Sequence, residues 1–229
     1  MDTGAIVGNL VWIIFVGVVV VVTIYVQRKR HARLTQWAAH RGWTYHRSLN
    51  SLANRWRSPP FNTGRSRKAT EVMTGMFHGE QALSFAYQYS TGGGKSQSTH
   101  RFHVVVLHLP AVLPWLQLTP ENFGTSVSKF FGGQDIRFES QAFNDAWRVQ
   151  GPEGQFPFDF IHPRMMARLL QPDAVGRNIT IEGQDIYVWT SGRQDETAID
   201  FYLNLLLGII QQVPRHLWLR VGYDPLQRR

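Results

Sequence analysis

The longest uninterrupted apolar run lies near the N-terminus and is long enough to cross a bilayer. Residues 5–26 contain no charged side chain, and Asn9 is their only strongly polar one. A helix of this length, at ~1.5 Å per residue, spans about 33 Å, which matches a hydrocarbon core of about 30 Å. A cleaved signal peptide would carry a basic segment before a shorter apolar core. Only Met-Asp-Thr-Gly precedes this run, so the pattern predicts a transmembrane helix.

Alternating apolar and polar positions predict several strands in the remainder of the chain. In residues 81–90, Leu83, Phe85 and Tyr87 alternate with smaller or polar side chains, which is typical of a half-buried strand. Other strands are expected over residues 43–47, 71–78, 101–109, 135–139, 147–150, 178–182 and 185–191. The last two are expected to form a hairpin, and residues 110–120 an irregular segment because of their three prolines.

Helical patterns occupy residues 162–170 and 197–213, and a short helix is expected near residues 125–131. The 197–213 segment contains Asp200 and Asn204 and is too short for a comfortable second span. We therefore interpret it as a core helix. The fold predicted is α+β: one N-terminal transmembrane helix, then a cytoplasmic domain with a curved, mainly antiparallel sheet of about six strands and two packing helices.

The positive charge is confined to one part of the chain. The net charge is +8, yet residues 27–70 hold eleven Lys or Arg and no acid, whereas residues 71–229 hold thirteen basic and fifteen acidic residues. We accordingly divide the chain into a short extracytoplasmic N-terminus (1–4), a transmembrane helix (5–26), a basic juxtamembrane segment (27–70) and a globular domain (71–229). Because basic residues favour the cytoplasmic side, the N-terminus is expected outside and the domain in the cytoplasm, at the plasma membrane.

The basic residues next to the span have two possible roles. They could contact anionic lipid headgroups, each contributing about 1 kcal/mol near the surface. The candidates for this role are Arg28, Lys29, Arg30, Arg33 and Arg41. Alternatively, Leu34 and Trp37 dock onto the domain and the arginines only set the topology. The slightly acidic domain argues against nucleic acid as a partner.

The sequence contains little that predicts catalysis or a cofactor. It has no Cys, which excludes disulfides, thiol nucleophiles and Cys-ligated metals. Residues 91–96 read Thr-Gly-Gly-Gly-Lys-Ser, but a phosphate-binding loop needs Gly where Tyr89 stands, and this loop joins two strands. His100, His103 and His108 are too widely spaced for a compact metal cluster. We predict no cofactor and no metal.

Glu139, Asp159 and His162 are the candidates for a catalytic group. A carboxylate beside a histidine can perform general acid–base chemistry, and these residues belong to the densest acid and His group in the chain. The competing interpretation is structural. Glu139 lies at the end of a predicted strand and, with Ser140, can accept bonds from turn amides, and Asp159 precedes a helix whose N-terminus favours negative charge.

One stretch resembles a bacterial, actinobacterial-type family of single-span membrane proteins of unknown function. It reads Glu139-Ser140-x-x-Phe143-x-x-x-Trp147-x-Val149, followed by His162-Pro163-Arg164-Met165-Met166-x-x-Leu169-Leu170 and a strand pair. The resemblance covers residues 130–190 and more loosely 33–229, with Trp147 where the family usually has Phe. It implies an architecture and no activity. In this chain we expect Phe143, Trp147, Val149, Met166, Leu169 and Leu170 to point inward.

The function predicted from these features is a membrane-tethered cytoplasmic interaction or scaffold module. It would contact anionic lipid through the basic segment and a protein partner, which the sequence does not identify, through its sheet or a helix face. The alternative is a membrane-bound, hydrolase-like enzyme that uses the acid and His group. The oligomeric state stays open.

Overall fold

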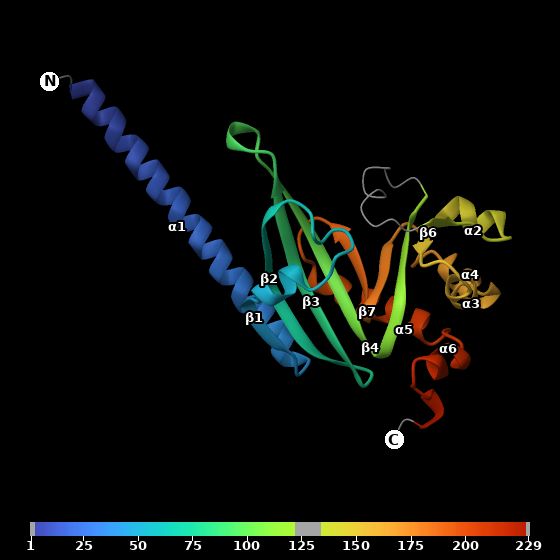
Figure 1. The fold of residues 1–229 in the computed structure, drawn as a ribbon. Coiled ribbons are helices and arrows are strands. Elements are labelled where there is room, and N and C mark those ends of the chain that lie inside the picture. The colour runs from blue at the N-terminus through green and yellow to red at the C-terminus, as the bar shows by residue number, and fades with distance from the viewer. Residues whose placement is uncertain (1–2, 122–133, 228–229) are drawn as a thin grey trace.

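The computed structural model describes residues 3–121 and 134–227. A long helix, α1 (Thr3–His40), leads into an antiparallel sheet with short helices packed around its far end (Figure 1). The strands of that sheet are β1 (Thr44–Ser48), β2 (Arg65–Phe77), β3 (Glu80–Thr91), β4 (Ser98–Pro120), β5 (Gln134–Ile136), β6 (Trp147–Gly151) and β7 (Asn178–Ser191). The other helices are α2 (Gln141–Ala146), α3 (Phe156–Phe160), α4 (Pro163–Leu169), α5 (Ile199–Ile210) and α6 (Arg215–Arg220).

The predicted α+β fold class is confirmed, with seven strands in place of about six. Their order is β1-β2-β3-β4-β6-β5, with β7 paired to β4, and every pairing is antiparallel. The helix expected near residues 125–131 lies outside the described residues. Helices α4 and α5 occupy the two segments predicted as packing helices.

Helix α1 is one uninterrupted element, and by length and composition it is the helix in the described chain that could span a membrane. It contains no proline, so nothing interrupts its backbone hydrogen bonds. It ends at His40 and is capped by Gly42, whose φ of +66° suits glycine. There, Gly42 N–H bonds Ala39 O (3.1 Å) and Trp43 N–H bonds Ala38 O (2.8 Å), which is a Schellman motif.

Strands β4 and β7 depart most from the lengths that the sequence pattern predicts. Strand β4 continues through Pro110 and Pro114, because register shifts between residues 108 and 116 leave these positions outside the regular ladder. Strand β7 is a single strand and not the hairpin expected at 178–191. It bends at Gly183 (φ +65°) to follow β4, which therefore pairs with β7 along almost its whole length.

The sheet has two unlike faces. Helix α5 and the end of α1 cover one face, where Leu34, Val105, Val188 and Leu206 belong to a single buried cluster. Residues 49–61 cover part of the other face with Trp56 and Phe61, and they include the short 3-10 helix η1 (Asn50–Asn54). That second face is more aromatic: Trp56 stacks on Phe85 with ring centroids 5.8 Å apart.

The boundary expected between residues 70 and 71 lies inside β2. Residues 44–70 contribute β1, η1 and half of β2, so most of the basic segment is part of the globular domain. The reason is the pairing of β1 with residues 70–74, which the charge pattern does not reveal. The motif residues do point inward: Phe143, Trp147, Val149 and Leu169 are buried, whereas Met166 and Leu170 are half-buried and Met165 takes the deeper position.

Candidate functional site

The junction between α1 and the sheet holds an ion pair on the buried side of the helix. Arg30 donates two hydrogen bonds to the carboxylate of Glu71 on β2, at 2.6 and 2.7 Å, and a third to the carbonyl oxygen of Gln194, at 3.0 Å. The bonds to Glu71 raise the pKa of Arg30 above its usual value. Both side chains are largely shielded from solvent, so this is a structural contact within the protein.

Two further arginines dock α1 onto the first turn of α5 and the 3-10 helix η4 (Glu196–Ala198) just before it. Arg33 lies 2.7 Å from the carboxylate of Glu196, and Arg41 forms a bidentate pair with Asp200. Between them, Leu34 and Ala38 are completely buried in the core. Arg30, Leu34, Ala38 and Arg41 recur at helical spacing along one side of α1. The docking interpretation of Leu34 therefore holds, and three of the five arginine and lysine candidates for lipid contact have carboxylate partners.

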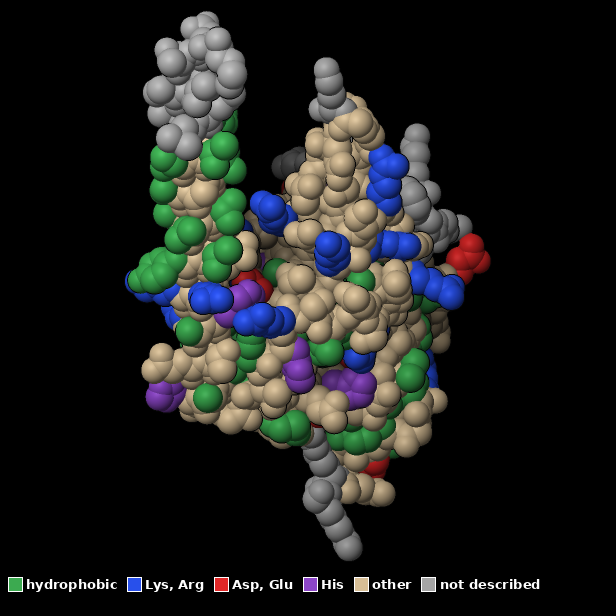
Figure 2. All heavy atoms as spheres, turned by 90° about the vertical axis from the view of Figure 1, so that its left-hand side faces the viewer, with side chains coloured by type: hydrophobic (Ala, Val, Ile, Leu, Met, Phe, Trp, Pro, Cys, Tyr) green, Lys and Arg blue, Asp and Glu red, His purple; other side chains and the backbone are tan. Residues whose placement is uncertain are grey.

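Arg28 and Lys29 differ from those three arginines. Both are exposed, and among the described residues neither has a carboxylate partner within 4.0 Å. Figure 2 shows Lys and Arg side chains at the level where the apolar part of α1 meets the domain, with few acidic side chains among them. Of the five residues predicted to contact lipid headgroups, Arg28 and Lys29 are therefore the two whose charge is not paired with a carboxylate of the described residues.

A groove separates α1 from the sheet just above the Arg30–Glu71 pair. Its volume is about 470 Å³, and Val22 and Val26 form its helix wall. The opposite wall contains Ala86, Arg101 and Arg193 from β3, β4 and the loop after β7. The helix contributes two valines besides polar residues, the opposite wall contributes guanidinium groups, and the Arg30–Glu71 pair also lines the groove. Sequence spacing could not reveal this combination because the walls are some 60 to 170 residues apart.

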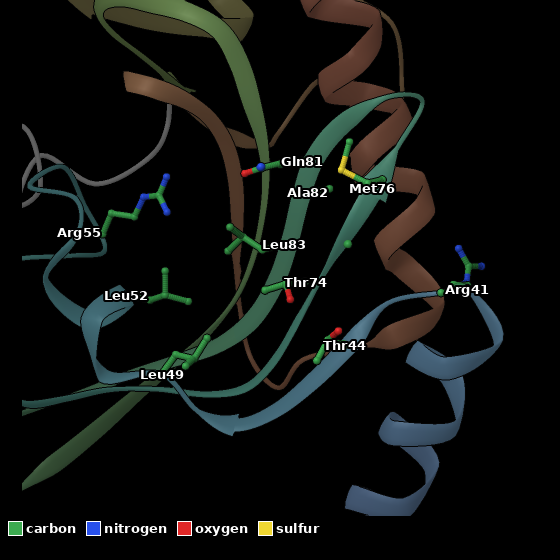
Figure 3. A pocket seen from close by; sticks show the side chains of 12 residues that line it. Arg41, Thr44, Leu49, Leu52, Arg55, Thr74, Met76, Gln81, Ala82 and Leu83 are labelled. Atoms are coloured by element: carbon green, nitrogen blue, oxygen red, sulfur yellow. The ribbon is translucent and has the colours of Figure 1, made fainter.

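A second hollow, of about 550 Å³, lies on the partly covered face of the sheet beside the edge strand β1. Figure 3 shows Leu49 and Leu52 of the η1 segment around the same space as Leu83 of β3, with Arg55 at its margin. Met76, also in the lining, is more than half exposed. This hollow is open and amphipathic, and its floor is regular sheet.

The candidate catalytic residues make separate contacts. Asp159 on α3 accepts a hydrogen bond from Arg220 on α6, at 2.8 Å. His162 donates from Nε2 to the carbonyl oxygen of Gln212, at 2.9 Å, and Glu139 is exposed between β5 and α2. Within residues 3–121 and 134–227, no hydrogen bond or ion pair joins any two of the three.

A serine and a histidine do meet, at positions that the sequence pattern did not single out as a pair. His103 Nδ1 accepts from the N–H of Asp195 (3.5 Å), so Nε2 carries the proton and donates to Ser84 Oγ (2.9 Å). Gln194 also donates to Ser84 Oγ, at 2.9 Å. In this tautomer the ring cannot take the serine proton, and both side chains are buried. Burial lowers the pKa of His103 from 6.5 to about 4.

The other two histidines are also engaged in the fold. His100 lies 2.9 Å from Thr91 Oγ1, and His108 lies 2.9 Å from the carboxylate of Asp185. That carboxylate, which is buried, also accepts from Arg55 and from the indole N–H of Trp56. The part of the chain that the structure describes contains no group of three His, Asp or Glu arranged to hold a metal ion.

The comparisons with known proteins concern the fold. The chain resembles a mycobacterial transport factor in structure. The crystal structure of the mycobacterial trehalose monomycolate transport factor A, TtfA, aligns with a TM-score of 0.57 over 85% of this chain and 97% of the other, at 15% sequence identity. No protein-family model matches the chain, and no curated protein matches it in sequence. At this identity the likeness to TtfA shows a shared fold.

Proposed function

We propose that this chain is a membrane-tethered interaction module, with a protein partner and with Arg28 and Lys29 in contact with anionic lipid headgroups. The observation that carries the proposal is the division of α1. Its apolar part is exposed, while three arginine–carboxylate pairs and two buried apolar residues hold its remainder against the domain, one pair on β2 and two at or just before α5. A continuous helix fixed to the sheet holds the domain at a set orientation to the bilayer, which suits a protein that presents a surface to a membrane partner.

The orientation follows from charge. The eleven basic residues within positions 27–70 favour the cytoplasmic side for the domain. Arg28 and Lys29 come directly after the apolar span, at the depth of the headgroups, and their charges are not neutralised by a carboxylate of the described chain. Each would contribute about 1 kcal/mol of attraction to an anionic leaflet.

The hollow beside β1 is the surface proposed for the protein partner. It combines exposed Met76 with the half-buried Leu49 and Leu83, and apolar side chains at the centre of a polar rim are typical of protein contacts. The fold neighbour is named a transport factor. This supports an accessory role in a transport process at the membrane, carried out by contact with another protein.

The enzyme alternative has weaker support. Asp159 and His162 contribute to the packing of α3, α4 and α6 through their bonds to Arg220 and Gln212. Within residues 3–121 and 134–227, no hydrogen bond or ion pair joins Glu139 to either of them. A general acid and base must both reach the same substrate atoms, and the described contacts give these side chains other partners.

A photo-crosslinking experiment in intact cells tests the partner surface. A photoreactive amino acid replaces Gln81 in the hollow, and in a control chain it replaces Arg164 on α4, outside the hollow; both positions are exposed. We expect a discrete adduct with another membrane protein from position 81 and none from position 164. Equal labelling from both positions, or none from 81, would contradict the proposal.

Protease accessibility of a C-terminal tag in the same cells tests the topology. We expect the tag to resist protease added outside intact cells and to be digested once the membrane is opened. Digestion in intact cells would place the domain outside the cell and contradict the proposed cytoplasmic orientation.

A further inference from the structure

The groove between α1 and the sheet has the properties of a lipid site, and its helix wall is the first of them. Val22, Val26 and Arg30 follow one another at four-residue spacing along α1, and all three line the groove. Leu34 and Ala38 are fully buried, whereas Val22 and Val26 are 53% and 57% exposed. Above the docked segment, Val22 and Val26 therefore face an open space of about 470 Å³ and not the core of the domain.

The sheet wall of the groove carries guanidinium groups, and the carboxylate in its lining, Glu71, is paired with Arg30. Gln88 and Arg101 line the groove and lie directly opposite one another across β3 and β4, and Lys68 of β2, outside the lining, continues the row. They alternate with Tyr87 and Phe102, which belong to the opposite face, so this row lies on the α1 side of the sheet. Arg193, in the loop after β7, completes the wall. Arg101 and Arg193 are exposed, and among the described residues neither has a carboxylate within 4.0 Å.

The groove also lies at the depth of the bilayer surface. Val26 is the last residue of the apolar run, and Arg28 and Lys29 follow it. The hairpin between β3 and β4 points to the same side of the molecule as the N-terminal part of α1 (Figure 1). When the helix spans a bilayer, this end of the sheet faces the headgroups and the groove opens toward the acyl chains.

We propose that this groove binds one anionic phospholipid of the surrounding leaflet, with its phosphate at Arg101 and Arg193 and an acyl chain along Val22 and Val26. Guanidinium groups bind phosphate oxygens through paired, charge-assisted hydrogen bonds. Val22 and Val26 offer an apolar surface to an acyl chain, which a phospholipid has and inorganic phosphate lacks. The inference rests on the proposed membrane tether, and it adds a specific lipid site to the general headgroup attraction of Arg28 and Lys29.

Native mass spectrometry of the full chain in detergent micelles tests this site. The chain is titrated with phosphatidylglycerol, and the number of bound lipids is counted. The test variant is Arg101→Gln/Arg193→Gln, and the matched control is Arg57→Gln/Arg164→Gln, which removes the same charge from exposed positions outside the groove. We expect the first lipid to bind about thirtyfold more weakly to the test variant, from about 1 kcal/mol per basic residue, and with unchanged affinity to the control.

Two further measurements separate this inference from its competitors. Phosphatidylcholine is expected to bind at least about tenfold more weakly than phosphatidylglycerol, because its headgroup carries no net charge, and inorganic phosphate is expected not to displace the lipid. Equal binding by the two double variants, or displacement by inorganic phosphate, would overturn the site. If the chain has the expected topology but the two double variants bind phosphatidylglycerol equally, the lipid site is contradicted and the proposed membrane tether is not.

Discussion

The two parts of α1 differ in their contacts: the first is exposed and the second packs against the domain. Residues 12–26 are apolar and exposed, whereas the basic stretch from Arg30 to Arg41 is the part bound to the protein. In a water-soluble helix the apolar residues would be the buried ones. The two parts therefore differ in their surroundings. The first has no protein packed around it in the described structure and is long and apolar enough to cross a membrane, whereas the second contacts the core and the carboxylates of the chain's own domain.

The largest expected effect compares apolar truncations in the two parts. Leu34→Ala removes a fully buried side chain from the core, and Ile24→Ala removes a similar one from an exposed position. We expect Leu34→Ala to lower the free energy of unfolding by about 3 kcal/mol and Ile24→Ala to leave it unchanged. Denaturant unfolding of the full chain in detergent micelles measures both. Similar losses would mean that the apolar part is also packed against the domain.

The docked part of α1 should loosen in acid because of His103. The pKa of His103 is about 4 in the folded protein and 6.5 in the unfolded chain. Below pH 6.5 the unfolded chain therefore binds a proton that the folded protein does not, and the free energy of unfolding falls as the pH drops toward 4. The expected loss is about 2 kcal/mol at pH 5. His103 holds the loop whose Gln194 carbonyl accepts from Arg30, so docking weakens with it. Unfolding followed from pH 7.5 to 4.5 is the measurement, and His103→Gln should flatten the profile between pH 6.5 and 4.5.

The next largest effect concerns a single ion pair. Arg30→Ala leaves the shielded Glu71 carboxylate without its partner, and we expect a loss of about 1.5 kcal/mol in the free energy of unfolding. Arg28→Ala, which removes an exposed side chain, should cost less than about 0.5 kcal/mol. The double variant Arg30→Ala/Glu71→Ala should lose less than the sum of the two single variants. Strict additivity would show that the pair contributes nothing.

The smallest effect separates lipid attraction from docking. In a chain that begins at Gln27, Lys29→Gln should weaken binding to vesicles containing phosphatidylglycerol about fivefold, from about 1 kcal/mol per basic residue. The same change should leave unfolding untouched. Arg164→Gln, at an exposed position on α4, is the matched control and should not alter flotation. Equal effects of the two substitutions would indicate a response to net charge alone.

Some features of this protein were determined by its sequence alone, because they depend on neighbouring residues. The apolar run, the end of α1 at Gly42, the half-buried pattern of β3 and the helices α4 and α5 all follow from local spacing. The α+β class followed from those elements. Local patterns can be read without knowing the fold because each residue's conformation depends first on its nearest neighbours in the chain.

The tertiary structure decided the partners, and with them the candidate sites. Glu71, Glu196 and Asp200 neutralise arginines that lie 41 to 163 residues away along the chain. The same long-range pairing keeps β4 extended past its prolines and joins β7 into one strand. It also brings Arg101 and Arg193 opposite Val22 and Val26. Charge and hydropathy describe what each side chain can contact, but only the folded sheet determines which of those contacts are made.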